Sequence, residues 1–149
     1  MRGLLLVSAL LALPGCSNES GLPIPEAMAA EAAEPTHADM VAVETIEAAE
    51  LSRMIARGEV VLVDVRTAEE FGSARLPGAL NAPITTFDVA SIPVEAERET
   101  ILYCRSARRS EQAAQMLAEH TGGTVRHLAG GIIAWEAAGE GVVGAQHAE

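Results

Sequence analysis

The chain has 149 residues, with 10 arginines, no lysine and 21 acidic residues, so its formal net charge is −11. That length suffices for one small domain with a hydrophobic core. The negative charge disfavours general electrostatic binding to nucleic acid, so no nucleic-acid partner is expected.

The first residues have the pattern of an export signal. Arg2 precedes an apolar run from Leu4 to Leu13, and the sequence Pro14-Gly15-Cys16 follows. Residues 1–15 are too few to span a bilayer as a mature helix, so we expect a signal peptide that is removed. The segment ending at Cys16 also resembles a bacterial lipobox, with Leu at −3 and Gly at −1 from the cysteine.

The lipobox resemblance implies a lipid anchor on Cys16. Several acyl chains at about 0.8 kcal/mol per buried CH₂ would hold the protein on a membrane essentially permanently. Ser17 follows the cysteine where Asp would favour retention in the inner membrane. We therefore expect a location in the bacterial cell envelope, on the outer membrane facing the periplasm. The alternative is an ordinary signal peptide in which Cys16 is incidental.

The remaining chain divides into a linker, a folded region and a tail. Residues 16–43 are rich in Ala, Glu and Pro without a sustained apolar period, which is typical of a flexible, acidic linker behind the lipidated end. Residues 44–142 carry the hydrophobic patterns of a folded domain, and residues 143–149 form a short tail.

Apolar periodicity predicts alternating strands and helices in the folded region. Thr45 is expected to cap a helix that runs through Arg57. Thr67 and Glu70 have the spacing of a capping box and open a short helix. The other expected elements are strands at 60–65, 79–82, 100–104 and 124–128, an irregular or weakly helical stretch at 83–99, and helices at 108–120 and 130–138.

This alternation predicts an α/β fold with a parallel sheet and right-handed crossovers. Ligands of such sheets bind beyond the carboxyl ends of the strands. Asp64 and Cys104 both stand at predicted strand ends, so the sequence places the functional site there.

Cys104 has the features of a nucleophile. It lies at a predicted strand-to-helix turn, where backbone N–H groups lack intrahelical partners, and Arg105, Arg108 and Arg109 follow it. Both features favour the thiolate over the thiol. If Cys16 carries lipid, Cys104 is the one thiol of the mature protein and has no disulfide partner. The alternative is a buried, inert cysteine that ends a core strand.

Four ordered motifs resemble the rhodanese family. Asp64-Val65-Arg66 precedes the capped helix, and Leu76-Pro77-Gly78-Ala79-Leu80-Asn81-Ala82-Pro83 is similar to the family's "I-P-G-A-x-N-I-P" segment. Tyr103 to Ser110 is similar to the active loop "Y-C-x-S-G-x-R-S", and Leu128 to Trp135 to the closing "L-x-G-G-x-x-x-W". Together the motifs cover residues 44 to 142. The resemblance implies a five-stranded parallel sheet with helices on both faces.

The same resemblance implies sulfur transfer through a persulfide on Cys104. Backbone N–H groups from Arg105, Ser106, Ala107, Arg108 and Arg109 would cradle the outer sulfur. Arg105 and Arg109 could hold an oxyanion donor such as thiosulfate, and cyanide or a thiol would accept the sulfur. Arg108 adds positive potential or is simply a solvated residue at the helix start. No cofactor and no metal site are expected, and the protein is expected to be a monomer.

Two positions depart from the family pattern. Ala107 replaces the usual Gly, so a positive φ there would strain the loop by roughly 1 kcal/mol or more. Arg75 stands where a His usually precedes the Pro-Gly segment, which should alter hydrogen bonding rather than chemistry. Asp64 and Arg66 are interpreted as a supporting ion pair after the strand, with a catalytic role as the less favoured alternative.

Two other functions compete with this interpretation. A cysteine phosphatase or arsenate reductase uses the wider spacing Cys-x₅-Arg, whereas Cys104 and Arg109 have the spacing Cys-x₄-Arg. The tighter loop fits one sulfur better than a phosphoryl group. A persulfide carrier without turnover, or a docking module of the envelope, would also keep the cysteine, and the sequence does not separate these from an enzyme.

Overall fold

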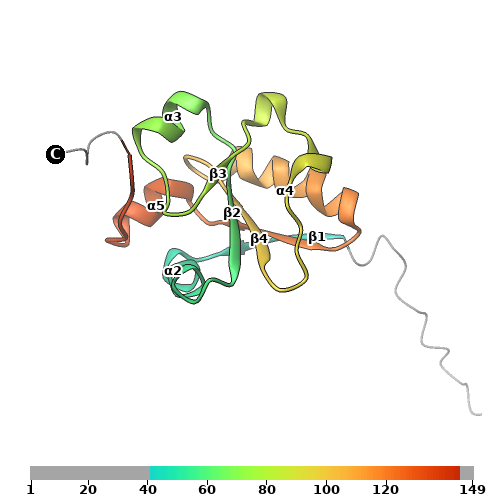
Figure 1. Cartoon of the computed structure of the whole chain (residues 1–149), viewed down its shortest axis with the longest axis horizontal. Helices are drawn as coiled ribbons and strands as arrows, with labels where there is room; N and C mark the ends of the chain where they lie inside the picture. The colour runs from blue at the N-terminus through green and yellow to red at the C-terminus, as the bar shows by residue number, and fades with distance from the viewer. Residues whose placement is uncertain (1–40, 145–149) are drawn as a thin grey trace, which may run out of the picture. The chain divides into compact units, whose positions relative to one another are not determined.

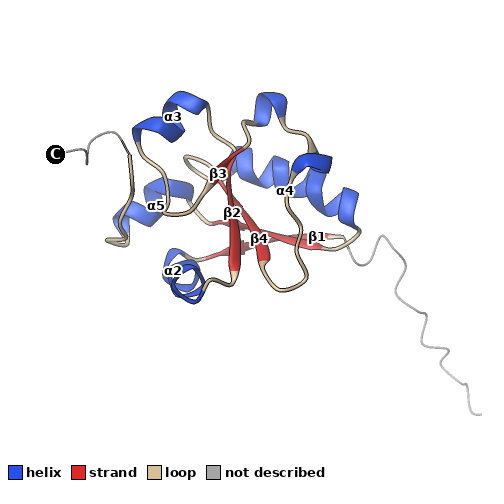
Figure 2. Ribbon diagram, viewed as in Figure 1, coloured by secondary structure: helices blue, strands red, loops and turns tan. Residues whose placement is uncertain are grey.

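The computed structural model describes residues 41–144. Its centre is a five-stranded sheet in the order β1-β5-β4-β2-β3, in which every neighbouring pair is parallel (Figures 1 and 2). The strands are β1 (Ala42–Ile46), β2 (Val60–Asp64), β3 (Leu80–Asn81), β4 (Glu99–Tyr103) and β5 (Thr124–Leu128). The helices are α2 (Ala48–Arg57), α3 (Ala68–Ser73), α4 (Arg108–Thr121) and α5 (Gly131–Ala137), with short 3₁₀ turns at Ile84–Thr86 and Val89–Ser91. The predicted α/β class and parallel sheet are confirmed.

The sheet is buried on both faces because its central strands carry consecutive apolar residues, Val60–Val63 in β2 and Ile101–Tyr103 in β4. In β4, Leu102 points into one hydrophobic cluster, together with Ala114 and Leu117 of α4. Its neighbours Ile101 and Tyr103 point into the other cluster. Successive side chains of a strand face opposite sides, so a two-sided core needs such a continuous apolar run.

Helices cover both faces, as expected. Helix α4 packs on one face, while α2 and α5 pack on the other (Figure 1). Leu51 of α2 and Trp135 of α5 are the anchors of the second layer, at 0% and 3% exposure. Burying each such large apolar side chain contributes roughly 1.5–3 kcal/mol.

The start of the domain differs from the prediction. Residues Ala42–Ile46 form strand β1 at the edge of the sheet, paired with β5, and Thr45 lies within that strand. Helix α2 begins only at Ala48, after the N-cap residue Glu47, which makes no side-chain capping bond. The predicted Thr45 cap is therefore wrong. Tertiary pairing with β5 overrides a local pattern that suits a helix start.

The other boundaries follow the predictions closely. Thr67 and Glu70 form both bonds of the capping box that opens α3. At the far end, Val143 exchanges two backbone hydrogen bonds with Arg75, at 2.7 and 2.8 Å, so the chain is held to the domain beyond α5.

Among residues 41–144, none of the helices combines the length and the apolar character needed to span a bilayer. The predicted signal peptide and the lipidation position Cys16 lie outside the described residues.

Candidate active site

The predicted site lies at the carboxyl edge of the sheet. Strand β4 ends at Tyr103, residues Cys104 to Ala107 form a turn, and α4 begins at Arg108 (Figure 2). We call residues 104–107 the cysteine loop. Strand β2 ends beside it at Asp64, because Asp64 and Tyr103 are register partners. The parallel topology thus brings the turn after β2 and the cysteine loop to the same edge.

Hydrogen-bond donors surround the sulfur of Cys104. The Ser110 hydroxyl lies 3.6 Å from Sγ, and the backbone N–H groups of Ser106, Arg109 and Ser110 also donate to it. Burial raises the pKa of the Cys104 thiol, but these donors outweigh burial and lower the pKa below its ordinary value. The loop therefore favours the thiolate. Ser110 is not one of the donors identified from the sequence.

Cys104 itself is buried. The residue is 1% exposed and belongs to the cluster between the sheet and α4. This burial agrees with the alternative interpretation, in which Cys104 is an inert cysteine at the end of a core strand. An inert core thiol, however, would be surrounded by carbon and would have a raised pKa, whereas this sulfur faces amide and hydroxyl hydrogens. Because Cys104 is only 1% exposed, the cysteine loop must move before a reagent can reach Sγ.

The loop holds Ala107 in an unusual conformation. Its φ of 85° and ψ of −37° make it the one non-glycine residue with positive φ among residues 41–144. A side chain in such a conformation strains the backbone by roughly 1–3 kcal/mol. The positive φ suspected at this position is confirmed.

The three arginines of the predicted site have different surroundings. Arg105 is exposed, and so is Arg108 at the first position of α4. The guanidinium of Arg109 is different, because it forms two hydrogen bonds to the carboxylate of Glu70, at 2.8 and 2.9 Å. Of the three, Arg109 has its charge already matched by a carboxylate.

Glu70 joins two parts of the site. Its carboxylate accepts from the N–H of Thr67 in the capping box, and it also binds Arg109 from across 39 residues of sequence. The Arg109 guanidinium and the Thr67 N–H lower the pKa of Glu70 to about 2. Sequence reasoning identified the capping box but missed this second role, because no local spacing connects Glu70 with Arg109.

Asp64 and Arg66 form a buried ion pair. Arg66 donates to both carboxylate oxygens of Asp64, at 2.6 to 3.0 Å, and its backbone N–H adds a bond of 2.9 Å. The side chains are 0% and 5% exposed. Asn81 closes the turn by donating to the carbonyls of both residues. The ion pair that the sequence predicted after this strand is present in the structure.

Helix α5 holds the cysteine loop from the other side. The N–H of Ile132 donates to the Cys104 carbonyl at 2.9 Å, and that of Ile133 donates to the Arg105 carbonyl at 3.3 Å. Gly131 has a φ of 61°, and a Cβ there would lie 2.6 Å from the carbonyl of Arg105. Gly131 of the Gly130-Gly131 motif is thus needed for the close approach of two backbones.

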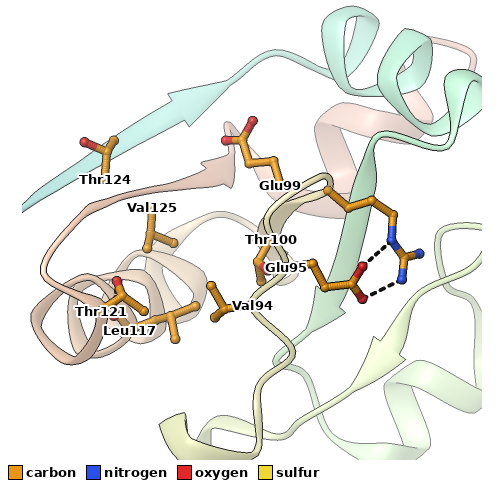
Figure 3. Close-up of a pocket in the computed structure, with 9 residues that line it drawn as sticks. Val94, Glu95, Glu99, Thr100, Leu117, Thr121, Thr124 and Val125 are labelled. Atoms are coloured by element: carbon orange, nitrogen blue, oxygen red, sulfur yellow. Dashed lines mark hydrogen bonds and ion pairs between the residues drawn. The ribbon is translucent and has the colours of Figure 1, made fainter.

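Two hollows in the surface of residues 41–144 lie at opposite ends of the sheet. A groove of about 420 Å³ adjoins the cysteine loop and is lined by Arg105, Ile132, Ile133 and Glu69, among others. A hollow of about 180 Å³ lies where β4 and β5 begin, beside the Glu95–Arg98 ion pair (Figure 3). Because parallel sheets bind ligands at their carboxyl ends, we assign function to the groove.

The fold and the site define an α/β protein with a thiolate-stabilising cysteine turn at the carboxyl edge of a parallel sheet. The protein-family model "Rhodanese-like domain" matches residues 47–138 of the sequence, and the chain therefore belongs to that family. This confirms the resemblance found in the four motifs.

Relatives and solved structures agree with this membership. The chain is 38% identical over 94 residues to a "Sulfurtransferase" of Allochromatium vinosum, covering 62% of this chain and 88% of the relative. It is 30% identical over 111 residues to the human "Thiosulfate:glutathione sulfurtransferase", covering 64% and 96%. The crystal structure of a thiosulfate sulfurtransferase from Pseudomonas aeruginosa superposes with a TM-score of 0.62 at 25% identity, covering 68% of this chain but only 20% of that one.

Proposed function

We propose that this protein is a sulfurtransferase that carries sulfane sulfur as a persulfide on Cys104. The single observation behind the proposal is the set of donors around Sγ: three backbone N–H groups and the Ser110 hydroxyl, which together lower the pKa of the thiol despite its burial. The same donors suit a persulfide anion, which carries one negative charge like the thiolate.

With thiosulfate as donor, the reaction has two balanced steps. The Cys104 thiolate attacks the outer sulfur of thiosulfate, the S–S bond of the donor breaks, and sulfite leaves with the electron pair. A persulfide anion is left on the protein. Cyanide or a thiolate then attacks the outer sulfur, which releases thiocyanate or a new persulfide and restores the Cys104 thiolate.

The exposed Arg105 is the better candidate for holding the donor's oxygens. It lines the groove beside the loop. Arg109, in contrast, is engaged by Glu70, so an anion would compete with a carboxylate for its guanidinium. We therefore expect Arg105→Ala to weaken the loading of thiosulfate more than Arg108→Ala, which removes an exposed arginine from the start of α4.

Intact-mass spectrometry of the full chain tests the proposal. Thiosulfate should add the mass of one sulfur atom, cyanide should remove it, and Cys104→Ser should abolish the gain. Cys16→Ser, which retains Cys104, is the matched control and should load normally. No gain from thiosulfate or from a persulfide donor would overturn the proposal. Turnover of p-nitrophenyl phosphate that depends on Cys104 would indicate a phosphatase instead.

A persulfide carrier without turnover is the second candidate, and the burial of Cys104 favours it. A carrier loads sulfur once and passes it to a partner, so small acceptors reach it slowly. Stopped-flow kinetics separate the two functions. An enzyme releases many sulfite molecules per protein in excess cyanide, whereas a carrier stops after about one equivalent.

We also propose that the protein is anchored in the bacterial cell envelope through lipid on Cys16. The support is sequence alone: the apolar run that ends at Leu13 and the Leu13-Pro14-Gly15-Cys16 segment. Fractionation of cells that express wild type or Cys16→Ser tests the anchor. The variant should leave the membrane fraction or remain unprocessed, and unchanged membrane retention with normal processing would contradict lipidation.

A further inference from the structure

His127 is a buried titratable residue next to the cysteine loop. It lies on β5, opposite Leu102 of β4, and is only 4% exposed. Its Nδ1 atom lies 3.2 Å from the hydroxyl oxygen of Ser110. That hydroxyl in turn lies 3.6 Å from the sulfur of Cys104. Three buried side chains, from the cysteine loop, α4 and β5, therefore form one continuous polar contact.

The hydroxyl of Ser110 has three neighbours and one hydrogen. Besides His127 and Cys104, the carbonyl oxygen of Ala107 lies 2.8 Å away. That carbonyl can only accept, and a thiolate can only accept. If Nδ1 of His127 were also an acceptor, three acceptors would compete for a single hydrogen. If Nδ1 carries the hydrogen, Ser110 receives one hydrogen bond and has its own hydrogen left to donate.

The carbonyl of Ala107 competes weakly for that hydrogen. It already accepts the backbone N–H of Glu111 at 2.9 Å, within the first turn of α4. A thiolate carries a full charge and binds a donor more strongly than a neutral carbonyl does. The sulfur is therefore the favoured acceptor of the Ser110 hydroxyl, provided that His127 acts as a donor.

We propose that His127 is a positioning residue for the reactive sulfur: its Nδ1–H donates to Ser110 and thereby directs the Ser110 hydroxyl hydrogen to Cys104. His127 does not contact the substrate and acts only through Ser110. The inference builds on the proposed role of Cys104 as the nucleophile. Its experiment measures the thiolate rather than sulfur transfer, so the two proposals can fail separately.

The charges near His127 agree with a neutral imidazole. Burial lowers the pKa of His127, and the carboxylate of Glu111 on α4 opposes that shift. A neutral imidazole carries one hydrogen on either nitrogen, so the choice of tautomer decides the direction of the Ser110 hydroxyl.

The experiment follows the rate of Cys104 alkylation by iodoacetamide across pH in the full chain, with Cys104→Ser as the blank that subtracts Cys16. His127→Leu removes the donor. His127→Asn retains an amide N–H that can occupy the place of Nδ1, and Ser110→Ala removes the hydroxyl. His120→Asn, at an exposed position of α4, is the matched control. Circular dichroism checks that each variant is folded.

We expect His127→Leu and Ser110→Ala to move the alkylation midpoint to higher pH. The rate at neutral pH should fall about ten-fold, because one hydrogen bond to a charged sulfur is lost. The plateau at high pH should not change. His127→Asn and His120→Asn should resemble wild type, and the double variant Ser110→Ala/His127→Leu should be no slower than Ser110→Ala alone.

Other results would overturn the proposal. A midpoint unchanged in His127→Leu, or a change confined to the high-pH plateau, would mean that His127 only packs the core. Additive effects in the double variant would mean that it acts independently of Ser110. If His127→Leu does not fold, ¹⁵N NMR of the wild-type imidazole decides: a hydrogen on Nδ1 supports the proposal, and one on Nε2 alone contradicts it.

Discussion

The two turns at the carboxyl edge of the sheet are built on opposite principles. In the turn after β2, Arg66 folds back on Asp64 two residues earlier, so the buried charges are neutralised within the turn, and Asn81 of β3 closes it. The cysteine loop after β4 is strained at Ala107 and is held by groups that come from elsewhere in the chain. The donors of the turn after β2 are used up in a local ion pair. The donors of the cysteine loop are instead available to the sulfur of Cys104.

The largest expected effect concerns the turn after β2. Asp64→Ala leaves the guanidinium of Arg66 buried without its carboxylate, which should lower the free energy of unfolding by about 3–5 kcal/mol. Urea denaturation measures the change. The double variant Asp64→Leu/Arg66→Met, which removes both charges, should recover most of the loss. A decrease below about 1 kcal/mol in Asp64→Ala would show that water or another group replaces the carboxylate.

Gly131→Ala tests the hold of α5 on the cysteine loop. The added Cβ would clash with the backbone of Arg105 at a residue with positive φ, so we expect a loss of about 2–3 kcal/mol in urea denaturation. The matched control is Gly72→Ala in α3, where a Cβ meets nothing within 4 Å and the helix favours alanine. Equal stability of the two variants would mean that the loop and α5 move apart freely.

These two turns also explain what the sequence could reveal. Asp64 and Arg66 are two positions apart at the end of an apolar run, so their proximity is visible in the sequence. The pair Glu70–Arg109 spans two motifs, and only the fold brings them together. Strand β1 was missed for a related reason: of its residues only Ile46 is buried, so an edge strand of this kind has little apolar periodicity. The burial of Cys104 depends on α4 and the sheet packing over it, which no spacing encodes.

Glu70→Gln tests the ion pair with Arg109 that connects α3 with the start of α4. The pair is partly exposed, so solvent screening limits the expected loss of stability to about 1 kcal/mol or less at neutral pH. The pKa of Glu70 falls from 4.5 to about 2 on folding, so its contribution is present above pH 4.5 and is lost as the pH falls toward 2.

The pH dependence gives this prediction a sharp control. Unfolding of wild type and Glu70→Gln should differ at neutral pH and converge as the pH falls below about 2, where the carboxyl becomes protonated in both the folded and the unfolded state. Glu69→Gln is the control variant, because it removes a neighbouring carboxylate from the first turn of the same helix. A difference between wild type and Glu70→Gln that is independent of pH would show that the Arg109 contact is not its origin.

The smallest expected effect is a gain in stability at the strained residue of the cysteine loop. Ala107→Gly relieves a positive φ, and glycine is also a better N-cap than alanine for α4. The larger conformational entropy of glycine in the unfolded chain removes part of that gain, which leaves about 0.5 kcal/mol of stabilisation. Thermal unfolding measures it, with Ala90→Gly in an exposed 3₁₀ turn as a control that should lose stability. A loss in Ala107→Gly would mean that the methyl group packs usefully and that the strain of the loop is compensated in place.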